Sequence, residues 1–295
     1  MMTFTTFAKE NKQFIEHELV AFVKRLESPA ILKESMLYSL QAGGKRVRPL
    51  LLFATLEAFG KPKELGMATA CALEMIHTYS LIHDDLPCMD DDDLRRGKPT
   101  NHKVFGEAIA TLSGDALLTM AFEVIARYSH SDVTPEVRLR IISELANAAG
   151  PEGMVAGQVA DMQGEGQSLS VADLEYIHKR KTGRLLEFAV LAGAVLAGAT
   201  EKQIEKLLAF AANLGLAFQI RDDILDVEGT EAEIGKPVGS DIGNGKSTYT
   251  ELLSIEGAKI ALHETAEKAR NAIDDLELNT VYLHALCDLV VNRNN

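Results

Sequence analysis

The chain has 295 residues, of which 46% are hydrophobic and 25% are charged, as in a globular protein with a large core. Its net charge of -13 argues against nucleic acid as a partner, because no basic field would offset the phosphates. Three cysteines, Cys71, Cys88 and Cys287, form neither a disulfide framework nor a CxxC zinc pair. We therefore expect a protein of a reducing compartment, the cytoplasm.

The N-terminal stretch MMTFTTFAKENKQF has no basic segment followed by an apolar core, so we expect no signal peptide. The longest uncharged apolar run, 188–199, is shorter than the roughly 20 residues that cross a bilayer. We therefore expect no membrane span.

Helical periodicity dominates from the N-terminus onwards. Apolar residues follow helical spacing over 14–26 and 67–82, and 201–227 is rich in Leu, Ala, Ile and Phe. Strand-like alternation is almost absent. Gly and Pro cluster at connections, namely 28–29, 60–62, 97–100, 134–135, 150–153, 164–166 and 229–245. We predict an all-α fold of about ten helices in one domain over 1–295, with several helices apolar nearly all round and buried.

A first acidic cluster closes the helix predicted to begin near Glu64. The stretch HDDLPCMDDDDLRR places six aspartates within ten positions, 84–93. Asp84 and Asp90 are six apart and would not share a face of an unbroken helix. Because Pro87 disfavours helical backbone at Leu86, a kink that bulges out two residues would move Asp90 to the place of an i+4 partner.

A second cluster, DDILD, closes the helix predicted to run from Glu201 to Gly229, and Asp222 and Asp226 share a face there. Carboxylates at a helix C-terminus are unfavourable by roughly 0.3–1 kcal/mol each, so two such clusters suggest compensating cations. Carboxylate ligands without nearby His or Cys favour Mg²⁺ over Ca²⁺ or Zn²⁺. The alternative is a pair of solvated acidic helix ends, and Asp91, Asp92 and Asp93 are best explained as such surface.

Short basic motifs lie beside glycines: GGKRVRP at 43–49, Arg95 and Arg96, KTGRLL from Lys181, and GKPVGSDIGNGKST with Lys236 and Lys246. Scattered Lys and Arg on an acidic protein that we expect to bind Mg²⁺ suggest phosphate groups. GNGKST is not a P-loop, because Ser240 stands where the first glycine is needed. The first acidic cluster is not an EF-hand, because Leu94 stands where that loop needs Asp or Asn.

Together these motifs resemble those of the trans-isoprenyl diphosphate synthases. GGKRVRP, DDLPCMD, DDDLRRGKPTNH, GQVAD, KTGRLL, FQIRDDILD and GKPVGSD follow in that family's order from about residue 40 to 250. The four-residue spacer of DDLPCMD is similar to that of the bacterial and plastid subtype, and the bacterial members that make farnesyl diphosphate are the most similar group. The resemblance implies a helical bundle around a central cavity, a homodimer, and Mg²⁺-dependent condensation of isopentenyl diphosphate with an allylic diphosphate.

The resemblance also implies residue roles. Asp84 and Asp90 would hold two Mg²⁺ ions and Asp222 a third, with Asp85, Asp223 and Asp226 in support. The allylic diphosphate would be held by Arg95, Lys181 and Lys236. Thr182, the Lys181 carbonyl and Gln219 would face the allylic cation. Isopentenyl diphosphate would be held by Gly44, Lys45, Arg48, His77 and Arg96.

Product length follows from the same resemblance, in which bulky residues four or five places before the first motif stop elongation. Those positions are Ser80 and Tyr79 here. Helical spacing alone aligns Ser80 with Asp84 better than Tyr79, but by resemblance an aromatic residue at 79 implies a C15 product, farnesyl diphosphate. Tyr79 as an ordinary core residue, and geranyl or geranylgeranyl diphosphate as the product, stay open. So do a class I terpene cyclase, a non-catalytic partner subunit and a plain acidic bundle.

Overall fold

The computed structural model describes residues 2–128, 130–229 and 247–293. Nearly all regular structure in these residues is helical, as the sequence predicts, and the exception is one short hairpin. The chain divides into two compact units, residues 1–53 with 62–142 and residues 54–61 with 143–295. The single domain expected over 1–295 stays a prediction, and the two units are described separately below.

The first unit is built around a buried helix. Its elements, some of which extend past its boundaries, are α1 (Phe4–Lys24), α2 (Ala30–Leu40), α3 (Val47–Ala58), η1 (Lys63–Gly66), α4 (Met67–Asp84), β1 (Leu94–Arg95), β2 (Lys98–Pro99), α5 (Asn101–Phe105), α6 (Glu107–Arg127) and α7 (Pro135–Ala149). Buried side chains, among them Cys71, Met75 and Ile82, point from all sides of α4. This all-round burial confirms the prediction for this helix and holds the first acidic cluster at the end of a rigid element.

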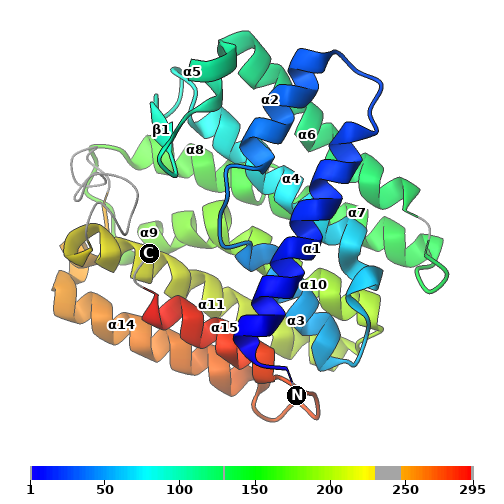
Figure 1. Cartoon of the computed structure of the whole chain (residues 1–295). Helices are drawn as coiled ribbons and strands as arrows, with labels where there is room; N and C mark the ends of the chain where they lie inside the picture. Colours follow the sequence, from blue (N-terminus) through cyan, green and yellow to red (C-terminus); the bar gives the residue numbers. More distant parts are fainter. Residues whose placement is uncertain (1, 129, 230–246, 294–295) are drawn as a thin grey trace. The chain divides into compact units, whose positions relative to one another are not determined.

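The second unit contains two long core helices and one π-helical turn. Its elements are α8 (Met154–Gly164), α9 (Val171–His178), η2 (Lys179–Gly183), α10 (Arg184–Ala197), α11 (Glu201–Glu228), α14 (Tyr249–Ile273) and α15 (Val281–Asn292). Figure 1 shows α11, α14 and α15 lying side by side, and these helices pack on one another. DDILD therefore lies on a helix supported along its length.

Local signals explain where α11 begins. The Thr200 hydroxyl accepts a hydrogen bond from the Gln203 amide at 3.3 Å, and the Gln203 side chain accepts one from the Thr200 amide at 2.9 Å. This capping box satisfies two amides that the helix leaves open. The preceding helix, α10, ends at Ala197 and is capped by Gly198, whose φ of 78° suits glycine.

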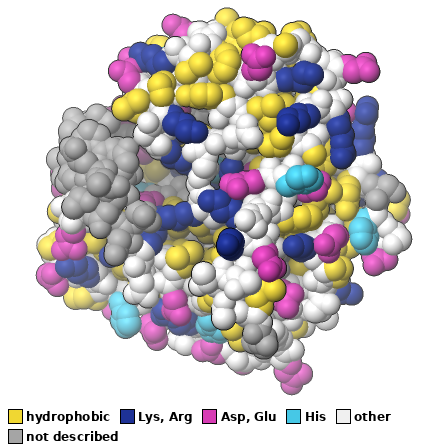
Figure 2. All heavy atoms as spheres, in the orientation of Figure 1, with side chains coloured by type: hydrophobic (Ala, Val, Ile, Leu, Met, Phe, Trp, Pro, Cys, Tyr) yellow, Lys and Arg dark blue, Asp and Glu magenta, His cyan; other side chains and the backbone are white. Residues whose placement is uncertain are grey.

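Among the described residues, α6 alone is long and apolar enough to cross a membrane. The core helix of a soluble protein passes the same test. α6 packs along α4, and its side chains Leu117 and Ala121 are buried. Acidic and basic side chains are interspersed on the face shown in Figure 2, and no broad basic surface is visible there.

Candidate functional site

The first acidic cluster folds as the proline predicts. α4 ends at Asp84, and the chain then turns back so that the amide of Asp90 donates to the carbonyl of Asp84 at 2.9 Å. In an α-helix this bond joins residues four apart, so two residues are looped out and Pro87 and Cys88 are exposed. The backbone thus brings Asp84 and Asp90 together at the end of a buried helix.

Asp85 points away from solvent and pairs with Arg95. The Arg95 guanidinium donates to Oδ1 of Asp85 at 2.6 Å, and its Nη2 also lies 3.3 Å from Oδ2 of Asp92. Burial raises the pKa of Asp85, although the bond to Arg95 opposes the shift. Asp85 therefore positions Arg95, which fits a supporting role.

Asp91, Asp92 and Asp93 are exposed, as predicted for surface residues. Asp93 forms an ion pair with Lys103 at 2.6 Å, and Asp92 meets Arg95. Asp91 has a φ of 49°, a left-handed backbone conformation at the turn. These contacts shape the loop that leads to the hairpin.

A two-residue turn presents Arg96. Leu94 pairs with Pro99 and Arg95 with Lys98, so Arg96 and Gly97 form the turn, with φ values of 54° and 73°. The Arg96 guanidinium reaches the glycine loop of GGKRVRP, where Nη1 donates to the Gly43 carbonyl. A Cβ at residue 44 would lie 2.6 Å from that nitrogen, so Gly44 leaves the space that Arg96 fills.

His77 lies beside these arginines. Its pKa is well below the usual value, first because of burial and then because of the positive charges of Arg48, Arg96, Arg46 and Arg95. His77 thus lies within the electrostatic reach of Arg48 and Arg96. That these residues form an isopentenyl diphosphate site stays a prediction. A neutral imidazole there can donate a hydrogen bond without adding charge.

Arg46 has a structural role that the sequence did not reveal. Its Nη1 donates to Oε2 of Glu74 at 2.6 Å, and its Nη2 donates to the Leu40 carbonyl at 2.5 Å. Both side chains of the ion pair are 3% exposed. This buried pair anchors the loop that carries Lys45, which is itself exposed.

In the second unit, the KTG motif lies in a π-helical turn, η2. Such wide turns occur often at functional sites. The Nζ of Lys181 lies 2.7 Å from Oδ2 of Asp161 on α8. A Cβ at residue 157 would lie 2.1 Å from the Lys181 amide nitrogen, so Gly157 permits α8 to pack on the backbone of the turn.

The same turn also packs on α11. A Cβ at residue 215 would lie 3.1 Å from the Cα of Gly183, so two glycines meet where α11 crosses η2. Thr182 adjoins Gly183, Gln219 lies one helical turn after Gly215, and both are partly exposed. The structure therefore carries Lys181, Thr182 and Gln219 on elements that pack together.

The three aspartates of DDILD differ in their surroundings. Asp223 is buried and accepts a hydrogen bond from the Tyr249 amide at 2.7 Å, so it holds the start of α14. Asp226 is buried as well, whereas the side chain of Asp222 is 43% exposed. Of the three, Asp222 is best placed to meet an ion from solvent.

Arg293 contacts Asp222. Its Nη2 lies 2.5 Å from Oδ1 of Asp222 and donates to the Phe218 carbonyl at 2.8 Å, and the guanidinium stacks on the Phe218 ring. Burial lowers the pKa of Arg293, and the charge of Asp222 opposes that shift. Within the described residues, the cation beside Asp222 is therefore the guanidinium of Arg293, and the Mg²⁺ expected there stays a prediction.

These donors suit a hard divalent ion. Among the described residues, no three His, Cys, Asp or Glu side chains converge on one closed metal site. Magnesium usually takes only one or two carboxylates from the protein and completes its shell with water and phosphate oxygens. Exposed Asp90 and partly exposed Asp84 and Asp222 fit that pattern. Lys236 and Lys246 lie outside the described residues.

Tyr79 and Ser80 differ in orientation. Tyr79 is 7% exposed, and burial raises its pKa, with the charge of Asp84 adding to the shift. Ser80 is partly exposed and donates to the His77 carbonyl at 3.0 Å. The bulky residue near Asp84 is thus Tyr79, but its effect on product length stays a prediction.

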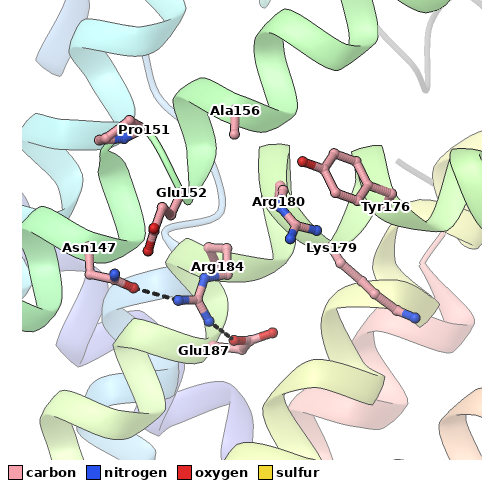
Figure 3. A pocket seen from close by; sticks show the side chains of 9 residues that line it. All are labelled: Asn147, Pro151, Glu152, Ala156, Tyr176, Lys179, Arg180, Arg184 and Glu187. Atoms are coloured by element: carbon pink, nitrogen blue, oxygen red, sulfur yellow. Dashed lines mark hydrogen bonds and ion pairs between the residues drawn. The ribbon is translucent and has the colours of Figure 1, made fainter.

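The second unit has a cavity of about 550 Å³ that is lined by residues outside the predicted site, among them Glu152 and Lys179 (Figure 3). Arg184 there donates to Asn147 at 2.6 Å and to Glu187 at 3.0 Å, and Arg180 stacks on Tyr176. The predicted residues Lys181 and Thr182 do not line it.

Comparison with known proteins agrees with the motifs. Residues 29–282 match the polyprenyl synthetase family model. The chain is 57% identical to a farnesyl diphosphate synthase of Geobacillus stearothermophilus over 98% of this chain and 97% of the relative. It is 45% identical to a geranylgeranyl diphosphate synthase of Cyanophora paradoxa over 98% of this chain and 96% of the relative.

A solved FPP/GFPP synthase from Zymomonas mobilis is similar in structure, with a TM-score of 0.86, 37% identity and coverage of 98% of both chains. A family model that spans most of the chain and relatives that align over nearly its full length lead to one conclusion. The chain belongs to the polyprenyl synthetase family.

Proposed function

We propose that the chain is a farnesyl diphosphate synthase, a Mg²⁺-dependent prenyltransferase. It condenses isopentenyl diphosphate with dimethylallyl diphosphate and then with geranyl diphosphate. The observation that carries this proposal is the 57% identity to a farnesyl diphosphate synthase over 98% of the chain. The closure of Asp90 onto Asp84 and the cationic group around His77 support it.

The reaction makes one carbon–carbon bond. The allylic C–O bond breaks and its electrons leave with the diphosphate. The isopentenyl double bond then attacks the allylic carbon, and the new cation loses a proton to the departed diphosphate. Mg²⁺, three ions by family resemblance, supplies charge that stabilises the leaving diphosphate. Asp84, Asp90 and Asp222 would hold these ions.

The first unit supplies the site for isopentenyl diphosphate. Arg48 and Arg96 bind its phosphate oxygens, and neutral His77 donates a hydrogen bond. Gly44 gives room to Arg96, and Lys45 adds a charge from the exposed loop. The separate basic group disfavours a terpene cyclase, which has no second diphosphate to hold.

The allylic diphosphate is bound by Arg95, Lys181 and Lys236. Asp85 and Asp161 orient the first two through bonds of 2.6 and 2.7 Å. Thr182 and Gln219 present oxygen dipoles to the allylic cation.

Tyr79 stops elongation after the C15 product, farnesyl diphosphate. The greater identity to a farnesyl than to a geranylgeranyl diphosphate synthase, 57% against 45%, favours C15 over C20. We further propose a cytoplasmic homodimer. The family resemblance supports the homodimer, and three free cysteines fit a reducing compartment.

One incubation tests the proposal. The pure protein is given Mg²⁺, dimethylallyl diphosphate and labelled isopentenyl diphosphate, and the dephosphorylated products are sized by chromatography. We expect a C15 product, and a reaction with heat-denatured protein is the negative control. No elongation would favour a non-catalytic partner subunit, whereas a C20 product would keep the family chemistry and refute the role of Tyr79.

A further inference from the structure

The ring of Tyr79 packs against that of His83. Both lie on α4, four residues apart, and therefore share a face of the helix. Their ring centroids are 5.6 Å apart with an interplanar angle of 78°, an edge-to-face contact within the favourable range. The imidazole thus restricts the tyrosine ring on one side.

His83 is held in place by α6. Its Nε2 donates to the Thr111 carbonyl at 3.1 Å. A Cβ at residue 114 would lie 2.1 Å from Nε2 and 2.4 Å from Cδ2 of the imidazole. Only glycine at position 114 leaves this notch open, so Gly114 and Thr111 together fix the histidine.

We propose that His83 and Gly114 are positioning residues that set product length through Tyr79. They are not expected to touch substrate, because Gly114 is buried in α6 and His83 bonds to that helix. The inference rests on the proposed role of Tyr79 as the residue that stops elongation. It adds that product length depends on the space at Gly114 in α6. This space holds the His83 imidazole, and the imidazole in turn holds the ring of Tyr79.

The direct test is Gly114→Ala. The imidazole would have to move by 3.4 − 2.1 = 1.3 Å to reach ordinary contact with the new Cβ. Tyr79 then loses its fixed neighbour and blocks elongation less well. The ratio of C20 to C15 product is expected to rise about 2- to 13-fold, the range that loss of one aromatic edge contact allows.

Products are sized after reaction with dimethylallyl diphosphate and labelled isopentenyl diphosphate at low conversion. Thr119→Ala, an exposed position on the same helix, is the matched control and should keep the wild-type ratio. A wild-type ratio in Gly114→Ala would overturn the inference. Enrichment of a shorter C10 product would also overturn the inference. It would mean that the displaced imidazole pushes Tyr79 towards the growing chain instead of releasing it.

A double variant separates this inference from the role of Tyr79. If Gly114 acts through Tyr79, Tyr79→Ala alone and Tyr79→Ala with Gly114→Ala should give the same products. Additive effects would overturn the inference. An unchanged C15 product from Tyr79→Ala would instead refute the proposed role of Tyr79, and the positioning role with it.

Should Gly114→Ala fail to melt cooperatively, His83→Gln replaces it. Glutamine keeps an N–H donor for the Thr111 carbonyl but removes the ring that faces Tyr79. The same rise in the C20 to C15 ratio is expected, and an unchanged ratio would overturn the inference.

Discussion

Replacing Gly157 with alanine is expected to displace the π-turn that carries Lys181. The new Cβ would lie 2.1 Å from the Lys181 amide nitrogen, 2.6 Å from its Cα and 2.7 Å from the Arg180 carbonyl carbon. All three are backbone atoms, which cannot rotate away as a flexible side chain can. Ordinary contact needs about 3.4 Å, so α8 and the turn must separate by 3.4 − 2.1 = 1.3 Å.

The cost follows from that displacement. Overpacking of this kind destabilises by about 1–3 kcal/mol, which corresponds to a drop of roughly 2–5 °C in melting temperature for a chain of this size. The separation also strains the bond between Lys181 and Asp161. A misplacement of about 1 Å in a group that positions substrate can lower turnover about 100-fold.

Melting temperature and steady-state turnover with Mg²⁺ and both diphosphates measure these effects. Gly183→Ala is the matched control, because its Cβ would make ordinary contacts, at 3.5 Å to the His178 carbonyl oxygen and 3.9 Å to Glu187. It should be neutral or slightly stabilising, since alanine favours helical backbone by up to about 1 kcal/mol. If Gly157→Ala melted and turned over like Gly183→Ala, the close approach of α8 to the turn would be refuted.

Three further predictions concern the charged groups. Asp84→Asn or Asp222→Asn should lower turnover at least about 100-fold at saturating Mg²⁺, and near-normal rates would remove that residue from the site. Arg46→Met should lower the free energy of unfolding in urea by about 3–5 kcal/mol, because it leaves Glu74 buried without its ion pair. The pKa of His77 is lowered in the native state, so below about pH 6.5 the unfolded state binds a proton that the native state does not. The free energy of unfolding therefore decreases as the pH is lowered from 7 to 5. His77→Gln should therefore lose less stability than the wild type between pH 7 and pH 5, and equal losses in urea titrations would contradict the lowered pKa.

Features set by neighbouring residues could be predicted from the sequence. Helical periodicity predicts α4 and α11, and Pro87 together with the six-residue spacing of Asp84 and Asp90 predicts the bulge. The glycine-flanked basic motifs predict which residues gather around His77, although only through the resemblance to a known family.

Features set by distant residues could not be predicted. The ion pair of Arg293 with Asp222 joins positions 71 apart, and that of Arg46 with Glu74 joins positions 28 apart. No local pattern marks such partners, because each depends on how whole helices pack. The π-turn depends in the same way on Gly157, which lies on another helix.

The bulge at Pro87 has a consequence for the comparison of related sequences. The bond from the Asp90 amide to the Asp84 carbonyl closes the helical repeat and leaves two residues outside it. Removing these two residues would leave an i+4 spacing in which an unbroken helix makes the same bond, so the two spacings can hold the aspartates at a similar separation. A motif search with a fixed spacing would miss this chain, whereas a search that allows the loop to vary would align Asp90 with the second aspartate of a shorter motif.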